Sequence, residues 1–222
     1  MRVKRKLFVE ASYRNKVNKR KAVLRKAESK FDKAKKDSKK NFKEVLNIKP
    51  VINDSVDNNL AKEARKYKAS VFEDKSNLLG YGKQNGILPG GDNSDFEYYA
   101  NSRKRFNKNN QREIDDMIKS SKKGESIIRH PKDSGIESLA HEIGHIQSGD
   151  RKVGKTPLED IKFALKDERR ASINAMGNLK RAGASNKEVK QGKSNLRTME
   201  KSYRFTKDRI RYAGKLGRNP NE

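Results

Sequence analysis

The sequence contains no cysteine among its 222 residues. This excludes disulfides, thiolate metal ligands and cysteine nucleophiles, so any metal site must use histidine or carboxylate side chains. Tryptophan is also missing, and histidine occurs only three times. No apolar run approaches the about 18 residues that a membrane span needs, and the N-terminus lacks the apolar stretch of a signal peptide. We therefore expect a protein without a membrane span, located in the cytoplasm or associated with a virion.

Apolar and acidic residues are both scarce. Hydrophobic residues make up 32% of the chain and charged residues 38%, which is too few apolar side chains for a fully packed globule of this length. We expect a core confined to part of the chain, with solvated helices attached. The 55 Lys and Arg outnumber the 29 Asp and Glu, a net charge of +26 that favours a polyanion such as DNA or RNA as a partner. A generally basic composition is the alternative explanation.

Glycine is absent from residues 1–50, and the first proline is Pro50. This segment holds 19 Lys and Arg and 5 Asp and Glu, and it predicts one long basic helix over residues 12–46. An apolar row at seven-residue spacing consists of Val17, Leu24 and Phe31. Because its companion row is weak, the helix buries little by itself. A solvated basic helix and a polyanion-binding arm remain equally compatible with the pattern.

The most informative motif is His141-Glu142-Ile143-Gly144-His145. A capping box over residues 134–137 predicts a helix around it. Residues four apart share a helix face, so His141 and His145 can offer two imidazole nitrogens to one metal ion. Glu142 lies about 100° around the helix, where it can reach a water on that metal. The predicted packing face consists of Ile136, Leu139, Ala140 and Ile143. Two surface histidines beside a glutamate are the alternative.

A third ligand is needed for a zinc site that keeps one position for water. His130 precedes a proline, and we expect it in a loop rather than at the metal. Thr156 and Glu159 predict the start of a second helix, on which Glu168 occupies a position where the apolar period predicts a core residue. A buried carboxylate needs a partner or a metal, whereas the alternative is a Glu168 that reaches solvent or pairs with an arginine. Asp167 is the reserve ligand, and the small Ala171 would let the two helices approach closely.

These residues resemble the gluzincin class of zinc metallopeptidases, in which a His-Glu-x-x-His helix is followed by a helix carrying a glutamate, often as Glu-x-x-Ala. The resemblance covers about residues 125–183 and implies that His141, His145 and Glu168 bind Zn²⁺ while Glu142 is the general base. The metzincin pattern does not fit, because Ser148 and Arg151 stand where its glycine and third histidine belong. The small, Lys- and Asn-rich chain also looks like a phage or mobile-element protein.

The expected function is zinc-dependent hydrolysis of peptide bonds in a protein or peptide substrate. Strand 126–129 would hold the substrate as an exposed edge, and Tyr203 or Tyr212 would donate to the oxyanion. The alternative is a basic structural or nucleic-acid-associated protein, such as a virion component, whose zinc site is structural or vestigial. The two differ at the fourth zinc position, which a catalytic site keeps for water and a structural site closes.

The C-terminal segment predicts a long helix that begins after Gly183 with a capping box at Ser185 and Glu188. Its apolar row at seven-residue spacing consists of Val189, Leu196, Tyr203 and Ile210. We expect it to pack on the zinc-site helices, with an oligomer contact through either terminal helix as the alternative. The predicted class is α+β, predominantly α. The predicted parts are a basic helical arm (1–50), a linker with a short helix (51–69), a zincin-like core (70–183) and a long helix (184–222).

Overall fold

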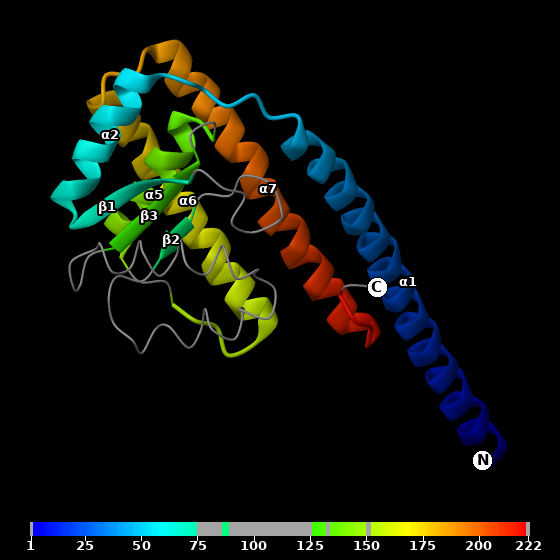
Figure 1. Ribbon diagram of the computed structural model, residues 1–222. Helices are drawn as coiled ribbons and strands as arrows, with labels where there is room; N and C mark the ends of the chain where they lie inside the picture. The colour runs from blue at the N-terminus through cyan, green and yellow to red at the C-terminus, as the bar shows by residue number, and fades with distance from the viewer. Residues whose placement is uncertain (1, 75–85, 89–125, 132–133, 150–151, 221–222) are drawn as a thin grey trace, which may run out of the picture.

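The structure, a computed structural model, describes residues 2–74, 86–88, 126–131, 134–149 and 152–220. Its elements are α1 (Arg2–Leu46), α2 (Asp54–Lys66), β1 (Ala69–Asp74), β2 (Gly86–Leu88), β3 (Ser126–Pro131), α5 (Ile136–Ser148), α6 (Pro157–Arg181) and α7 (Asn186–Leu216) (Figure 1). Helices dominate beside one small sheet, which confirms the α+β, predominantly α class. Parts of the core predicted at 70–183 lie outside the described residues. Among the described helices, none is both long and apolar enough to cross a membrane.

Three strands form the sheet in the order β1-β3-β2. Strand β3 pairs in parallel with β1, where Val71 lies opposite Ile128, and antiparallel with β2, where Ile87 lies opposite the same residue. Strand β3 is therefore central. The prediction that residues 126–129 form an exposed edge for a substrate is wrong, because their backbone groups face a partner strand on both sides.

The hydrophobic core lies between the sheet and helices α2, α5, α6 and α7. The predicted packing face of α5 is buried in full and consists of Ile136, Leu139, Ala140 and Ile143. Leu60 of α2, Ile128 of β3 and Leu179 of α6 belong to the same cluster. Because each fully buried aliphatic side chain contributes roughly 1.5–3 kcal/mol, this core holds α5 in place and with it the two histidines.

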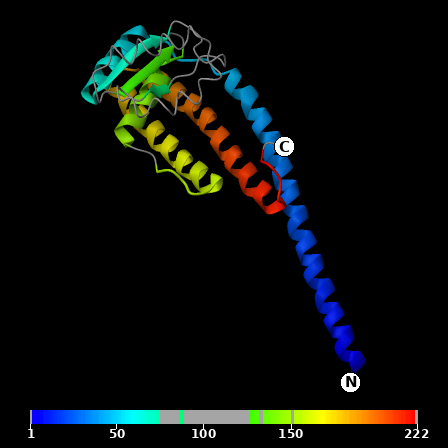
Figure 2. The same ribbon diagram turned by 60° about the horizontal axis from the view of Figure 1, so that its bottom comes forward.

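Helix α7 packs against α5 and α6 on one side and against α1 on the other. Among the α1 residues whose side chains are described, which begin at Lys16, the buried ones are Ala27, Phe31, Ala34 and Asn41. Leu24, predicted to share a seam with Phe31, is 40% exposed. Before Ala27 the helix runs on past the end of α7 (Figure 2). The arm predicted at 1–50 thus has a packed half and a projecting half, and the partner surface of the packed half is α7 of the same chain.

The start of α5 differs from the predicted capping box. Its N-cap is Gly135, at a φ of 86°, and no side chain caps the helix. The Glu137 carboxylate is fully buried and accepts hydrogen bonds from the Val51 N–H, at 3.2 Å, and from Asn195 Nδ2, at 2.6 Å. These donors lie far away in sequence, and they draw Glu137 away from the backbone of Ser134.

The starts of α6 and α7 follow their predicted signals more closely. Thr156 accepts a hydrogen bond from the Glu159 N–H, although the Glu159 side chain bonds the Lys155 N–H rather than closing the box. Ser185 and Glu188 form both bonds of a capping box, as predicted. The turn between α6 and α7 reverses the chain, so α7 runs back along α6. Helix α7 also covers a second face of α5, the helix that carries the two motif histidines, and that face therefore lies in the interior.

Candidate metal centre

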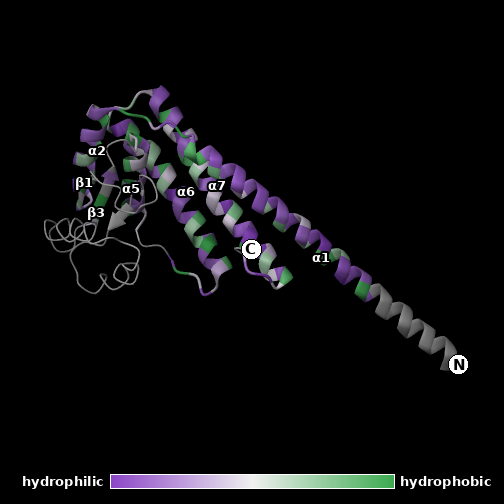
Figure 3. Cartoon of the chain, turned by 45° about the vertical axis from the view of Figure 1, so that its right-hand side comes forward, coloured by the Kyte–Doolittle hydropathy of each residue, from purple (hydrophilic) through white to green (hydrophobic). Residues whose placement is uncertain are grey.

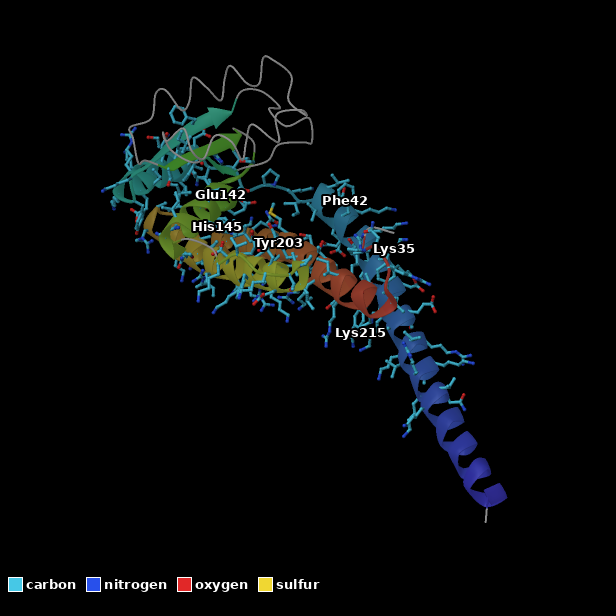
Figure 4. All side chains as sticks on the ribbon, turned by 90° about the horizontal axis from the view of Figure 1, so that it is seen from below. Lys35, Phe42, Glu142, His145, Tyr203 and Lys215 are labelled. Carbon is cyan, nitrogen blue, oxygen red and sulfur yellow. The ribbon has the colours of Figure 1, made fainter. Side chains whose placement is uncertain are left out.

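Helix α5 turns both motif histidines toward one point. The Nε2 atoms of His141 and His145 lie 3.1 Å apart, and the two rings meet edge to face with their centroids 4.6 Å apart. This follows from their four-residue spacing on a helix whose opposite face is locked into the core. Glu142 and His145 lie together on α5, which runs between the sheet and α6 (Figure 4).

Helix α6 brings Glu168 to the same point. Its Oε2 atom lies 3.1 Å from His141 Nε2, and its Oε1 atom lies 3.7 Å from His145 Nε2. One ligand atom from each residue lies within 4.8 Å of the others. Glu168 therefore points inward as its position in the apolar period predicts, while the neighbouring Arg169 pairs with Glu200 instead.

A close approach of the two helix backbones makes this meeting possible. A Cβ atom added at Gly144 would lie 2.3 Å from the Ala171 carbonyl oxygen and 3.0 Å from the Ala171 Cα atom. No real side chain tolerates such contacts, so position 144 accepts only glycine while the helices keep this spacing. The sequence argument identified Ala171 but not Gly144. A signal was present, since a glycine inside a helix costs about 1 kcal/mol relative to alanine and needs a reason.

The second nitrogen of each histidine also has a partner. Asp167 Oδ2 lies 3.0 Å from His145 Nδ1, and its other oxygen accepts a bond from Arg170 at 3.1 Å. Ser172 Oγ lies 3.4 Å from His141 Nδ1. Such partners orient metal-binding imidazoles and fix their tautomers. Asp167, the reserve ligand, thus occupies the outer side of His145, and sequence reasoning missed Ser172 because its own position carries no signal.

The charges of the cluster are coupled. Burial by itself lowers the pKa of His145, but the hydrogen bond to Glu168 and the charges of nearby carboxylates outweigh it and raise that pKa to about 9. Burial by itself raises the pKa of Glu168, but its bonds to His141 and His145 hold that pKa well below its ordinary value. The site therefore keeps an ionised carboxylate among partly buried nitrogens, an arrangement that favours a cation at its centre.

Glu142 has a different environment from the three clustered residues. Burial raises the pKa of Glu142, and the charges of His141 and His145 oppose this only in part. Within the described part of the chain, no hydrogen bond holds its carboxylate. A carboxyl group whose pKa moves toward neutrality is better suited to exchange protons with a substrate or a water. Glu142 is thus a buried carboxyl group with a raised pKa, next to His141 in the sequence.

The donor set fits zinc. Two imidazole nitrogens and one carboxylate oxygen are typical ligands of a site that leaves a fourth position for water. Bonds of about 2.0–2.1 Å at tetrahedral angles place ligand atoms about 3.3 Å apart. The two Nε2 atoms lie 3.1 Å apart, and each lies near a different Glu168 oxygen, His141 Nε2 at 3.1 Å from Oε2 and His145 Nε2 at 3.7 Å from Oε1. One ligand atom from each residue lies within 4.8 Å of the others, which is close enough for one ion to reach all three residues.

His130 lies apart from this cluster, but it is not in a loop as predicted. It is a buried residue of β3, with Nε2 2.9 Å from Asp57 Oδ1 and Nδ1 3.0 Å from Ser134 Oγ. The sequence suggested a loop because Pro131 follows, yet the strand continues through that proline. His130 joins α2, β3 and the segment before α5, and so helps to orient the helix that carries the motif.

The two tyrosines considered as oxyanion donors lie on α7. The Tyr212 ring lies 5.5 Å from Lys30 Nζ of α1. It therefore belongs to the α1–α7 contact, and its role as an oxyanion donor stays a prediction. Tyr203 is half-buried near the middle of α7, and its role stays a prediction.

Comparisons of the chain with protein-family models, with curated proteins and with solved structures found no match. What the cluster does must therefore be argued from its own geometry and chemistry.

Proposed function

We propose that the protein is a zinc-dependent hydrolase of peptide bonds. His141, His145 and Glu168 would hold the metal, and Glu142 would act as the general base. The observation that carries this proposal is the convergence of three ligand atoms from two helices, each within 4.8 Å of the others, beside a carboxylate with a raised pKa. The choice of a peptide bond rests on the resemblance to the gluzincin pattern.

Each residue has one task in this reaction. Zinc held by these three residues would supply a Lewis acid that lowers the pKa of a water toward ~7 and polarises a carbonyl. Glu142 would take up a proton at its carboxylate and release it to a leaving amine. Asp167 and Ser172 hold the imidazoles of His145 and His141 in the orientation that points both Nε2 atoms inward.

The first experiment measures the zinc content of the purified protein. We expect about one zinc per chain in the wild type and in Glu142→Gln, and almost none in His145→Ala or Glu168→Ala. Glu159→Ala is the control. It removes a carboxylate from the first turn of α6, the helix that carries Glu168, and this variant should keep its zinc. Wild-type protein that takes up no zinc from excess metal would overturn the proposal.

A second measurement separates a catalytic site from a structural one. Cleavage of a mixed peptide library by the wild type should disappear in Glu142→Gln while the zinc remains. A protein that binds zinc but cleaves nothing in such a library, with or without Glu142, would instead be a structural metalloprotein. That outcome would leave the metal assignment intact and remove the enzymatic one.

A further inference from the structure

Helix α1 changes its surroundings at one point along its length. From Ala27 onward it packs on α7, whereas every described residue from Lys16 to Lys26 is exposed except the half-buried Val17. The helix stays regular throughout, so positions 2–26 form a helix of about 37 Å, at about 1.5 Å per residue, ahead of Ala27 (Figures 1 and 2). None of the side chains described between Lys16 and Lys26 is buried against the body of the protein.

The charge of α1 changes at the same point. Residues 16–27 hold six basic and no acidic residues, whereas residues 28–46 hold seven basic and four acidic ones. Glu28 pairs with Arg218, and Glu44 pairs with Lys201, so two acidic residues of the packed half tie it to α7 or to the segment just after it. Within the described part of the chain, none of the six basic side chains before Ala27 forms an ion pair. The basic residues are Lys16, Lys19, Arg20, Lys21, Arg25 and Lys26.

These basic side chains surround the helix rather than lining one face. At about 100° per residue, Lys19, Arg20 and Lys21 alone span about 200° of its circumference. The apolar residues form no broad face, since Val17 and Leu24 share one narrow row while Val23 points about 100° away from Leu24. Hydrophilic residues predominate along the described part of α1 (Figure 3). A helix that lies in a membrane surface needs a broad apolar face, which the described part of this projection lacks.

We propose that the projecting segment of α1, residues 2–26, binds duplex DNA by lying in its major groove. The segment carries eleven Lys and Arg and one Glu. A major groove about 12 Å wide accepts one α-helix and places phosphates of both strands beside it, which suits charges that surround the helix. The major groove of duplex RNA is too narrow for this. The contacts are made to phosphates, so the binding is independent of base sequence.

This proposal is independent of the zinc site. The packed half of α1 connects the projecting helix to the body, so DNA held at one end leaves the His141 cluster free at the other (Figure 2). Deleting residues 1–50 would be a poor test, because it also removes the side chains that cover α7. Substitutions confined to exposed positions of the full-length chain avoid this problem.

The test compares two full-length variants with the same loss of charge. One carries Lys16→Gln, Lys19→Gln and Arg20→Gln in the projecting segment. Its control carries Lys187→Gln, Lys190→Gln and Lys193→Gln, which are exposed positions on α7. Binding to a fluorescent 30-base-pair DNA is measured by anisotropy between 50 and 200 mM salt, and circular dichroism checks that helix content is unchanged.

We expect the α1 variant to bind at least tenfold more weakly, while the control changes by less than threefold. The slope of log K against log salt should fall by up to about 2.7 in the α1 variant, from about 0.9 per lost phosphate contact. Equal losses in both variants would reduce the effect to overall charge and overturn the proposal. The proposal would also be overturned if the wild-type protein did not bind DNA, or if it bound only to vesicles of anionic lipid.

Discussion

The α5–α6 pair and the α1–α7 pair are joined in different ways. Between α5 and α6 the backbones touch at Gly144 and Ala171, and polar groups are buried where the helices meet. Asn178, which is fully buried on α6, donates to the Ala140 carbonyl of α5. The backbone approach and this buried hydrogen bond fix the two helices against each other, which is the condition for holding three ligand atoms within reach of one metal ion.

Between α1 and α7 the contact is looser. Phe31 and Ala34 supply buried apolar surface, and Asn41 donates to the Thr198 carbonyl. The rest includes exposed ion pairs such as that of Glu28 and Arg218, which contribute little to stability. A contact of this kind holds α1 against the body of the protein, but it does not fix individual side-chain atoms to within a fraction of an ångström. A substitution in one helix pair should therefore leave the other pair intact, and the α5–α6 pair should tolerate changes in side-chain size less well than the α1–α7 pair.

The largest effect is expected from Phe31→Ala, which removes the largest buried apolar side chain among the described residues of α1. Phe31 is 3% exposed, so the loss is about 3–5 kcal/mol of local stability. Hydrogen exchange should show protection lost along α1, while zinc affinity changes by less than twofold. Leu24→Ala, one heptad earlier and 40% exposed, is the control and should have a much smaller effect. A large loss of zinc affinity in Phe31→Ala would show that the two pairs are coupled.

The next effect comes from Gly144→Ala, because the new Cβ atom would meet the Ala171 carbonyl oxygen at 2.3 Å. The helices must separate, which we expect to cost about 1–3 kcal/mol and to abolish tight zinc binding. Gly177→Ala on α6 is the control, since its Cβ meets only the flexible end of Arg181 at 3.3 Å. That variant should gain up to about 1 kcal/mol from helix propensity. Denaturant unfolding and zinc titration of both variants decide the matter.

The different nature of the two pairs also explains what sequence alone could predict. His141 and His145 could be paired because their meeting depends only on helix geometry. Glu168 could be added because its helix has a readable period. The partners of the Nδ1 atoms could not be predicted from the sequence. Asp167 and Glu168 are neighbours on α6, and the rotation of α6 about its axis relative to α5 decides which of them faces His145 Nδ1 and which faces His141 Nε2.

Long-range contacts account for the remaining errors. The capping box at Ser134 fails because Val51 and Asn195, both distant in sequence, offer donors to Glu137. The prediction of strand 126–129 as an edge fails because two segments distant in sequence, 69–74 and 86–88, pair with it on opposite sides. Local patterns predicted the starts of α6 and α7, but α1 begins at Arg2 rather than at residue 12 as predicted. The partners of each element had to come from the folded chain.

A smaller effect is expected from Asp167→Asn, which keeps the shape of the partner of His145 Nδ1 but removes its charge. Outer partners of this kind typically change metal affinity by about 10–100-fold, so the variant should bind zinc in that range more weakly and still fold. Arg170→Gln removes only the donor to the other Asp167 oxygen and should have a weaker effect in the same zinc titration. Complete loss of zinc in Asp167→Asn would make Asp167 a direct ligand.

The smallest effect concerns Glu137, a buried carboxylate that lies outside the cluster. Burial raises the pKa of Glu137, and the hydrogen bonds from Asn195 and from backbone N–H groups oppose this only in part. A folded-state pKa above the unfolded one means that the folded protein binds this proton more tightly. The resulting stability is fully present below the unfolded pKa of about 4.3 and is lost as pH rises through the folded pKa.

Glu137→Gln lacks this titration, so the variant supplies the reference for the wild type. The advantage of the wild type over the variant should shrink as pH rises above about 4, because only the wild type then acquires a buried charge. The raised pKa of His145 is common to both proteins, so its contribution cancels in the difference between their unfolding free energies. Denaturant unfolding of the metal-free proteins from pH 4 to pH 8 measures that difference. An advantage that grows with pH would mean that the donors from Asn195 and Val51 outweigh burial, and that Glu137 is held as an ion.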